Sequence, residues 1–144
     1  MKATRILLVD DEVSFVKGLG RTLTRQGLSV ISAGNGREAL DCLSSEQGRK
    51  VDVVILDVKM PGMNGLEALV AIKRLDPLLE IILLTGHATV ESAIEGIKLG
   101  AFDYLLKPCD LETLLAKIKE AADKKRRQEI KIIEALARNR VKDN

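Results

Sequence analysis

The sequence is poor in the residues that build aromatic cores and covalent cross-links. It has no tryptophan, and aromatic residues make up only 2% of its 144 residues. The core must therefore be aliphatic, built from leucine, isoleucine, valine and alanine. The two cysteines, Cys42 and Cys109, stand in unrelated contexts and do not form a disulfide framework. We expect both to be reduced thiols, as in a cytosolic protein.

The chain also lacks a long apolar run. No stretch approaches the roughly 18 residues that cross a bilayer. The N-terminus has one short apolar stretch that ends in two acids, Asp10 and Asp11, which is not the form of a signal peptide. We therefore expect a cytoplasmic protein without membrane contact. A chain of this length buries roughly 68–70% of its unfolded surface, so it needs no disulfide or metal to fold.

Positive charge is scarce in the body of the chain and concentrated in its tail. The formal net charge is +2, but residues 119–144 hold nine basic and five acidic residues, which leaves the rest slightly acidic. Such a body lacks the basic footprint of a nucleic-acid-binding domain. The run Lys124–Arg127 could touch phosphates, yet such a run more often forms a solvated helix face. We expect no direct DNA binding by this chain.

Short apolar runs alternate with segments of helical length, and they do so five times. Three of the runs are almost wholly apolar, as strands buried on both faces should be. The second run is mixed and is expected near an edge of the sheet. Five strand-then-helix units predict an α/β fold with a parallel sheet and helices on both faces. The five runs are residues 6–9, 28–31, 53–56, 81–84 and 104–106.

Local signals predict where the helices begin and end. Asn35 with Glu38, and Asn64 with Glu67, have the spacing of an N-cap and the acid of a capping box. Two further residues are expected as N-caps, and two glycines fall where helices end. These residues are Thr89, Asp110, Gly27 and Gly100.

The last predicted helix is longer than a compact domain needs. It can start at Leu111 and run past Leu136, because neither glycine nor proline follows Pro108. Its apolar face is interrupted at Lys124–Arg127 and then resumes. We expect a domain over residues 1–121 and a helical extension over residues 122–144, which would serve as a dimer helix or as the stub of a linker.

Chemically active residues follow four of the five strands. In open α/β sheets, functional groups gather outside the carboxyl ends of the strands. Three clustered carboxylates repel one another and favour a divalent cation, and oxygen ligands suit Mg²⁺. A carboxylate beside Mg²⁺ can act as a nucleophile toward phosphorus, and a lysine can neutralise phosphoryl oxygens. The residues concerned are Asp10, Asp11, Asp57, Thr85 and Lys107.

These segments resemble the receiver domain of a two-component response regulator, over residues 4 to about 121. The matching segments are Ile6–Glu12, Asp57–Gly65, Thr85-Gly86-His87 and Lys107-Pro108. The run from Thr85 through Tyr104 looks most like regulators of the sigma-54-activator type. The resemblance implies a flavodoxin-like (βα)5 fold, a doubly wound five-stranded parallel sheet of order 2-1-3-4-5, with the extended C-terminal helix added.

The resemblance also implies a role for each site residue. Asp57 would accept a phosphoryl group from a sensor histidine kinase. Asp10, Asp11, Asp57 and the backbone carbonyl of Lys59 would hold Mg²⁺. Lys107 would contact the acyl phosphate, and the Lys107–Pro108 bond would be cis.

The resemblance further implies a switch rather than a metabolic enzyme. Thr85 would move toward the phosphoryl group and Tyr104 would rotate inward, which would change the face made by the fourth helix, fifth strand and fifth helix. That face, or the C-terminal helix, could form a homodimer. Lys59 and His87 would flank the attacking water and set how long the phosphoryl group lasts. The kinase, the signal and the output stay open.

Two other functions fit the residues less well. An aspartyl-phosphate hydrolase would need a second acid two residues after Asp57, where Lys59 stands. A nucleotide-binding oxidoreductase would need a third glycine after Gly34 and Gly36, and none follows at the required spacing.

Overall fold

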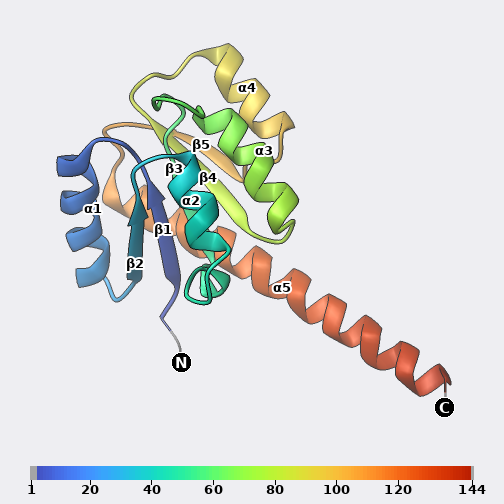
Figure 1. Ribbon diagram of the computed structural model, residues 1–144. Coiled ribbons are helices and arrows are strands. Elements are labelled where there is room, and N and C mark those ends of the chain that lie inside the picture. Colours follow the sequence, from blue (N-terminus) through green and yellow to red (C-terminus); the bar gives the residue numbers. More distant parts are fainter. Residues whose placement is uncertain (1–2, 144) are drawn as a thin grey trace.

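The computed structural model describes residues 3–143, with side chains over residues 3–140, and strands alternate with helices along this length (Figure 1). One short 3₁₀ helix precedes the third strand. The elements are β1 (Arg5–Val9), α1 (Val13–Arg25), β2 (Ser29–Ala33), α2 (Gly36–Leu43), η1 (Gly48–Lys50), β3 (Val53–Leu56), α3 (Gly65–Leu75), β4 (Glu80–Thr85), α4 (Val90–Lys98), β5 (Asp103–Leu106) and α5 (Leu111–Asp143).

The five strands form one parallel sheet in the order β2-β1-β3-β4-β5, which confirms the predicted flavodoxin-like topology. The mixed second strand lies at an edge, as expected. It runs from Ser29 to Ala33 rather than over residues 28–31, because it pairs residue for residue with β1 from Arg5 to Val9.

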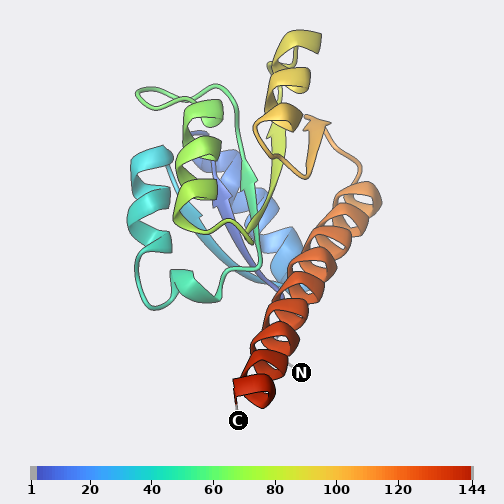
Figure 2. The ribbon, with the colours of Figure 1, turned by 90° about the vertical axis from the view of Figure 1, so that its right-hand side faces the viewer.

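Helices cover both faces of the sheet, and the core is accordingly split in two. Alternate side chains of each strand point to opposite faces. Leu7 and Val9 of β1 pack in the cluster beneath α2 and α3. Ile6 and Leu8 pack in the cluster that includes α1 and the first part of α5. Figures 1 and 2 show α1 and α5 on one side of the sheet, with α2, α3 and α4 on the other.

The helix caps follow the sequence with one difference. Asn64 caps α3 in a complete capping box with Glu67, and the Thr89 side chain accepts a hydrogen bond from the Ser92 amide at the start of α4. At α2, Asn35 accepts from the amide of Glu38, but the Glu38 carboxylate accepts from Gly34 instead of from Asn35. The predicted box is therefore only half formed there.

Three more expected ends of helices are confirmed. Asp110 accepts a hydrogen bond from the amide of Thr113 in the first turn of α5. Gly27 and Gly100 have φ values of 89° and 107°, a left-handed conformation that glycine adopts at little cost.

The long helix α5 is continuous, and its second part leaves the body of the domain (Figures 1 and 2). Its first part packs on the sheet through Leu114, Ile118 and Ala121. Beyond that part, Ile133 and Leu136 are 65% and 60% exposed. In the described part of the chain, no helix has the length and apolar character needed to span a membrane.

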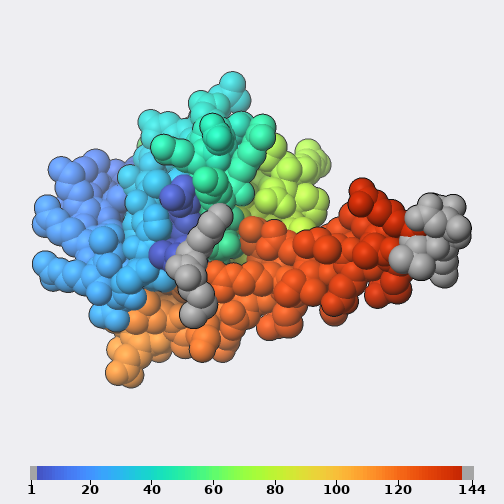
Figure 3. Space-filling view, turned by 90° about the horizontal axis from the view of Figure 1, so that it is seen from below, coloured from blue at the N-terminus to red at the C-terminus, as the bar shows by residue number. Residues whose placement is uncertain are grey.

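The basic run in α5 is only partly the solvated face that the sequence favours, because Arg126 and Arg127 are exposed while Lys125 is only 7% exposed. Lys124 lies 3.4 Å from the buried carboxylate of Glu80 at the start of β4. Lys125 and Arg126 lie 3.9 and 4.0 Å from Asp52, just before β3. The run therefore holds α5 against the amino edge of the sheet, where Figure 3 shows α5 crossing beneath the body.

Two glycines, one in α1 and one in α3, test how closely these helices approach the rest of the fold. Gly18 lies within α1 with open space around it, so Gly18→Ala should stabilise the fold by about 0.5–1 kcal/mol. At Gly65, a Cβ would overlap the carbonyl oxygen of Asp57, so Gly65→Ala should destabilise it by about 1–3 kcal/mol. Urea unfolding of both variants measures the two effects, and a stabilising Gly65→Ala would contradict the close approach of α3 to the Asp57 loop.

Candidate functional site

The strand register brings Asp10 and Asp57 side by side at the carboxyl edge of the sheet. Val9 of β1 pairs with Leu56 of β3, and the next residue in each strand is the aspartate. The amide of Asp57 donates to the carbonyl of Val9 over 2.9 Å, which continues the ladder by one step. Both side chains are buried, at 5% and 3% exposure. This point, where the strand order reverses, is where open α/β sheets bind ligands.

A third carboxylate completes the cluster. One oxygen from each of Asp10, Asp11 and Asp57 lies within 4.8 Å of the others. Asp11 is exposed, and Asp57 Oδ1 is buried without a hydrogen-bond partner among the described residues. Buried polar oxygens normally have a partner. An orphaned carboxylate oxygen beside two further carboxylates is a fitting donor set for a hard cation such as Mg²⁺.

Lys107 supplies the positive charge of the site. Its Nζ donates to Asp10 over 2.6 Å and lies 3.8 Å from Asp57. The ammonium also lies 4.0 Å from the centre of the Phe15 ring, a cation–π contact. Burial alone would lower the pKa of Lys107, but the hydrogen bond to Asp10 and the nearby negative charges outweigh it and raise the pKa. Lys107 is therefore charged at neutral pH.

The pKa of Asp57 is raised above its ordinary value. Burial is the main cause, and the charge of Asp10 adds to it. The Thr85 hydroxyl, the charge of Lys107 and the backbone of Lys59 act in the opposite direction. The ionised carboxylate is thus held at a cost in the folded protein, which a bound cation would offset.

Thr85 ends β4 inside the protein, beside this cluster. It is fully buried, and its hydroxyl accepts a hydrogen bond from the amide of His87 over 3.1 Å. Its carbonyl accepts from the amide of Lys107 over 2.9 Å, which ties the ends of β4 and β5 together. The Lys107–Pro108 bond is cis, as expected.

A cavity of about 380 Å³ opens above Asp57. The predicted modulating residues Lys59 and His87 both line it, and both are exposed. The remaining lining comes from residues of the loops after β1 and β3. These are Asp11, Glu12, Met60 and Pro61.

Tyr104 lies apart from this cavity. Its hydroxyl is 2.8 Å from the Ser92 hydroxyl of α4, and the side chain is half-buried against the core. The fold therefore links β5 to α4 through Tyr104, while Asp10, Asp11, Asp57, Thr85 and Lys107 gather at the carboxyl edge.

Sequence reasoning missed three contacts of the site. Glu12 lies 3.4 Å from Lys107, Phe15 stacks under the same ammonium, and Ser92 meets Tyr104. The acidic run before α1, which Glu12 ends, could have indicated that Glu12 lies near Lys107. No local pattern points to the other two, because Phe15 and Ser92 look like ordinary positions of amphipathic helices.

The geometry agrees with comparisons to known proteins. The family model of the response regulator receiver domain matches residues 6–119, and the chain belongs to this family. It is 39% identical over 116 residues to the transcriptional regulatory protein ZraR of Escherichia coli O157:H7, covering 81% of this chain and 26% of that protein. It is 40% identical over 114 residues to the DNA-binding transcriptional regulator NtrC of Klebsiella pneumoniae, covering 79% and 24%.

These relatives are regulators of the sigma-54-activator type, as the sequence indicated. The chain spans about a quarter of their length.

Solved structures agree with this assignment. A receiver domain protein from Clostridium thermocellum superposes with a TM-score of 0.80 at 36% identity, covering 85% of this chain and 97% of that one. A response regulator from Burkholderia pseudomallei, solved with a phosphorylated aspartic acid and a calcium ion, gives a TM-score of 0.75 at 32% identity, covering 93% and 74%.

The charge cluster predicts how stability depends on Asp57 and Mg²⁺. In EDTA at pH 7, Asp57→Asn should unfold at a higher temperature than the parent, because it removes a carboxylate with a raised pKa. This advantage should shrink as the pH falls through the raised pKa, where Asp57 itself becomes neutral. Added Mg²⁺ should stabilise the parent more than the variant.

Thermal unfolding with and without Mg²⁺ checks this prediction. The exposed Asp41 in α2 gives a charge-matched control, since Asp41→Asn should keep the full Mg²⁺ response. Equal stabilisation of all three proteins by Mg²⁺ would show that Asp57 does not bind the metal.

Proposed function

We propose that this receiver domain is a phosphorylation-controlled signalling switch that takes a phosphoryl group from a sensor histidine kinase onto Asp57. The observation that carries the proposal is the buried Oδ1 of Asp57, which has no hydrogen-bond partner in the described residues, beneath an open cavity and with Lys107 within 3.8 Å of the same carboxylate. The position supports a nucleophile that is shielded from solvent but reachable by a phosphodonor.

The proposed transfer uses the carboxylate of Asp57 as nucleophile and the charge of Lys107, with Mg²⁺ added. An oxygen of Asp57 attacks the phosphorus of a phosphohistidine, the phosphorus–nitrogen bond breaks, and its electron pair returns to the imidazole. Mg²⁺, held by Asp10, Asp11, Asp57 and the Lys59 carbonyl, would supply charge neutralisation at the phosphoryl oxygens. Lys107 contributes a further positive charge to the transferred group.

Loss of the phosphoryl group closes the cycle. Water attacks phosphorus and the bond from phosphorus to the Asp57 oxygen breaks, which releases phosphate. Lys59 and His87 line the cavity through which water would approach, and this supports their proposed role in setting the lifetime. The chain assists these two steps on itself and is not a metabolic enzyme.

Phosphorylation would change the local charge by about −1.5 to −2 at pH 7. We propose that Thr85 then gives up its hydrogen bond from His87 and turns to a phosphoryl oxygen. Tyr104, freed from Ser92, would turn inward toward the space that Thr85 leaves. These two movements would shift the face formed by α4, β5 and α5.

That face carries apolar side chains suited to a partner. Val90, Ile94 and Ile97 of α4 and Leu106 of β5 are each about half exposed or more. The extension over residues 122–144 provides a second surface, with Ile130, Ile133 and Leu136 exposed along α5. We propose that the extension pairs with the same helix of a second copy, and that an output domain or downstream protein responds to this pairing.

The ion pairs of Lys124–Arg126 with the sheet support an architectural role for the basic run rather than DNA contact.

Phosphotransfer can be tested with a small phosphodonor. Incubation with acetyl phosphate should add one phosphoryl mass in the presence of Mg²⁺ and none in EDTA, as read by intact-mass spectrometry. Asp57→Asn should stay unlabelled, while Asp41→Asn should be labelled like the parent. Stoichiometric labelling of Asp57→Asn would show that Asp57 is not the phosphoryl acceptor.

The switch needs a second readout, because labelling alone does not report it. Lys107→Ala should keep the fold but lose the change in amide hydrogen exchange over α4 and β5 that follows labelling of the parent. A normal exchange response in labelled Lys107→Ala would count against a part for Lys107 in the switch.

The dimer proposal can be tested by light scattering. The parent should show a dimer mass that Ile133→Glu combined with Leu136→Glu reduces to the monomer, because two buried charges would face each other across a short coiled coil. Lys131→Glu, on the other side of the helix, is the control and should leave the dimer intact. A dimer that persists in the double variant would show that the two copies pair through the face of α4, β5 and α5 instead.

A further inference from the structure

A second charged cavity lies at the amino edge of the sheet, opposite the edge that carries Asp57. It has a volume of about 700 Å³ and is formed by residues at the starts of β1 and β2, by η1 and the residue before β3, and by α5. Five basic side chains line it, against two acidic ones, Asp52 and Glu129. The basic residues are Arg5, Arg49, Lys50, Lys125 and Arg126.

Lys125 is the unusual member of this group. It is only 7% exposed, and its Nζ lies 3.9 Å from Asp52 and 3.6 Å from Glu129. This Nζ is not among the buried polar atoms without a partner in the described residues, so the ammonium itself reaches the open cavity. An anion in the cavity can therefore approach the ammonium more closely than either acid does.

The cations from η1 point to the same kind of partner. Arg49 and Lys50 are exposed and form no ion pair within the part of the chain that the structure describes. Asp52 already accepts from the amide of Arg5 and is shared with Lys125 and Arg126. The cavity thus has a surplus of positive charge that the protein itself does not neutralise.

The lining also limits the chemistry of the ligand. It contains no aromatic residue on which a base could stack, so recognition would rest on charge and hydrogen bonds. Guanidinium and ammonium groups together match phosphate oxygens, the arginines as planar forks and the lysines as point charges. A volume of about 700 Å³ is ample for a compact ligand.

We propose that this cavity binds a compact oligophosphate anion, a diphosphate group held between η1 and α5. Arg49 and Lys50 would bind it from the body of the domain, and Lys125 and Arg126 from the helix. Such a ligand would accept hydrogen bonds from Lys125 and would tie the C-terminal helix more firmly to the sheet. The proposal is independent of phosphorylation at Asp57.

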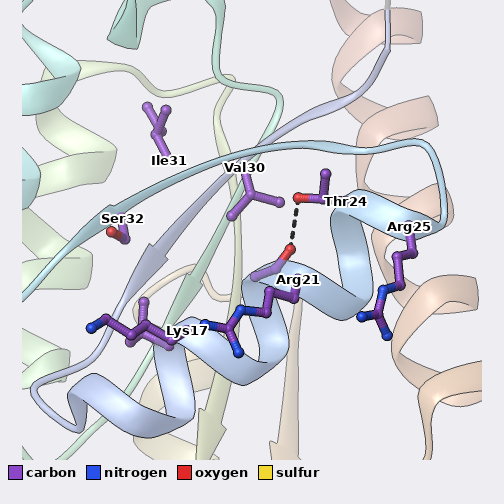
Figure 4. A pocket seen from close by; sticks show the side chains of 9 residues that line it. Lys17, Arg21, Thr24, Arg25, Val30, Ile31 and Ser32 are labelled. Atoms are coloured by element: carbon purple, nitrogen blue, oxygen red, sulfur yellow. Dashed lines mark hydrogen bonds between the residues drawn. The ribbon is translucent and has the colours of Figure 1, made fainter.

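A second basic pocket makes the natural control. It lies between α1 and β2, has a volume of about 530 Å³ and is lined by Lys17, Arg21 and Arg25 (Figure 4). All three side chains are exposed, so this pocket has no cation fixed by a buried side chain as Lys125 is. Removing Lys17 and Arg21 changes the net charge as much as removing Arg49 and Lys50.

The test is titration with pyrophosphate in Mg²⁺-free buffer at 0.15 M salt, followed by calorimetry and by two-dimensional NMR of the amides. We expect saturable one-to-one binding, with the largest shifts at Ser29, Lys50 and Lys125. Arg49→Ala with Lys50→Ala should weaken binding by about tenfold or more. Lys17→Ala with Arg21→Ala should leave it unchanged.

Two further experiments ask whether a nucleotide or a free diphosphate is the ligand, and whether Lys125 takes part in binding. Adenosine diphosphate should bind as pyrophosphate does if only the phosphates are recognised, whereas much tighter binding of the nucleotide would contradict the proposed ligand class. Lys125→Met should weaken binding while thermal unfolding shows a folded protein.

Three results would overturn the proposal. One is an equal effect of sulfate at matched ionic strength, which indicates charge screening. Another is the same loss of affinity in both double variants, which indicates net charge. The third is a set of amide shifts centred on Asp57, which places the anion at the other edge.

Discussion

The ion pair between Lys107 and Asp10 holds the carboxyl edge of the sheet together. The strand register forces Asp10 and Asp57 into adjacent buried positions, and two carboxylates so placed repel each other. The single ammonium 2.6 Å from Asp10 and 3.8 Å from Asp57 offsets this repulsion. Because Lys107 follows β5 and Asp10 follows β1, the pair also joins two strands that have two others between them in the sheet. In the switch that we propose, the phosphoryl group on Asp57 competes with Asp10 for the ammonium of Lys107.

The precision of the site comes from the apolar sheet beneath it. All residues of β3 and β4 are buried, so the ends of these strands have little freedom. The loop after Asp57 is fixed in turn by α3, since Asn64 caps that helix and Gly65 passes against the backbone of Asp57. A rigid base with reactive groups only on its rim lets a small change in charge act on a few loops without disturbing the core.

The sequence predicted those features that depend on short-range pattern. Alternating apolar runs predicted the strands, and polar residues after them predicted the cluster around Asp57, while the strand order itself rested on the family resemblance. Contacts between distant segments escaped prediction. Lys124 meets Glu80 across 44 positions and Arg126 meets Thr4 across 122. A run of basic residues looks the same in sequence whether water or buried acids face it, so only the fold could decide.

Helix α5 connects the two charged edges of the sheet. Only three residues separate Lys107 from its first turn, so a displacement of Lys107 must be passed to the start of α5 or absorbed in that short link. One turn further, Lys117 pairs with Asp103 of β5 over 3.0 Å, and at the opposite edge Lys124 pairs with Glu80. A helix pushed at one end and anchored near its middle tilts about the anchor, because a continuous helix is stiff. Since the exposed apolar residues Ile133 and Leu136 lie beyond the anchor, a small displacement of α5 at the carboxyl edge of the sheet would move them the most.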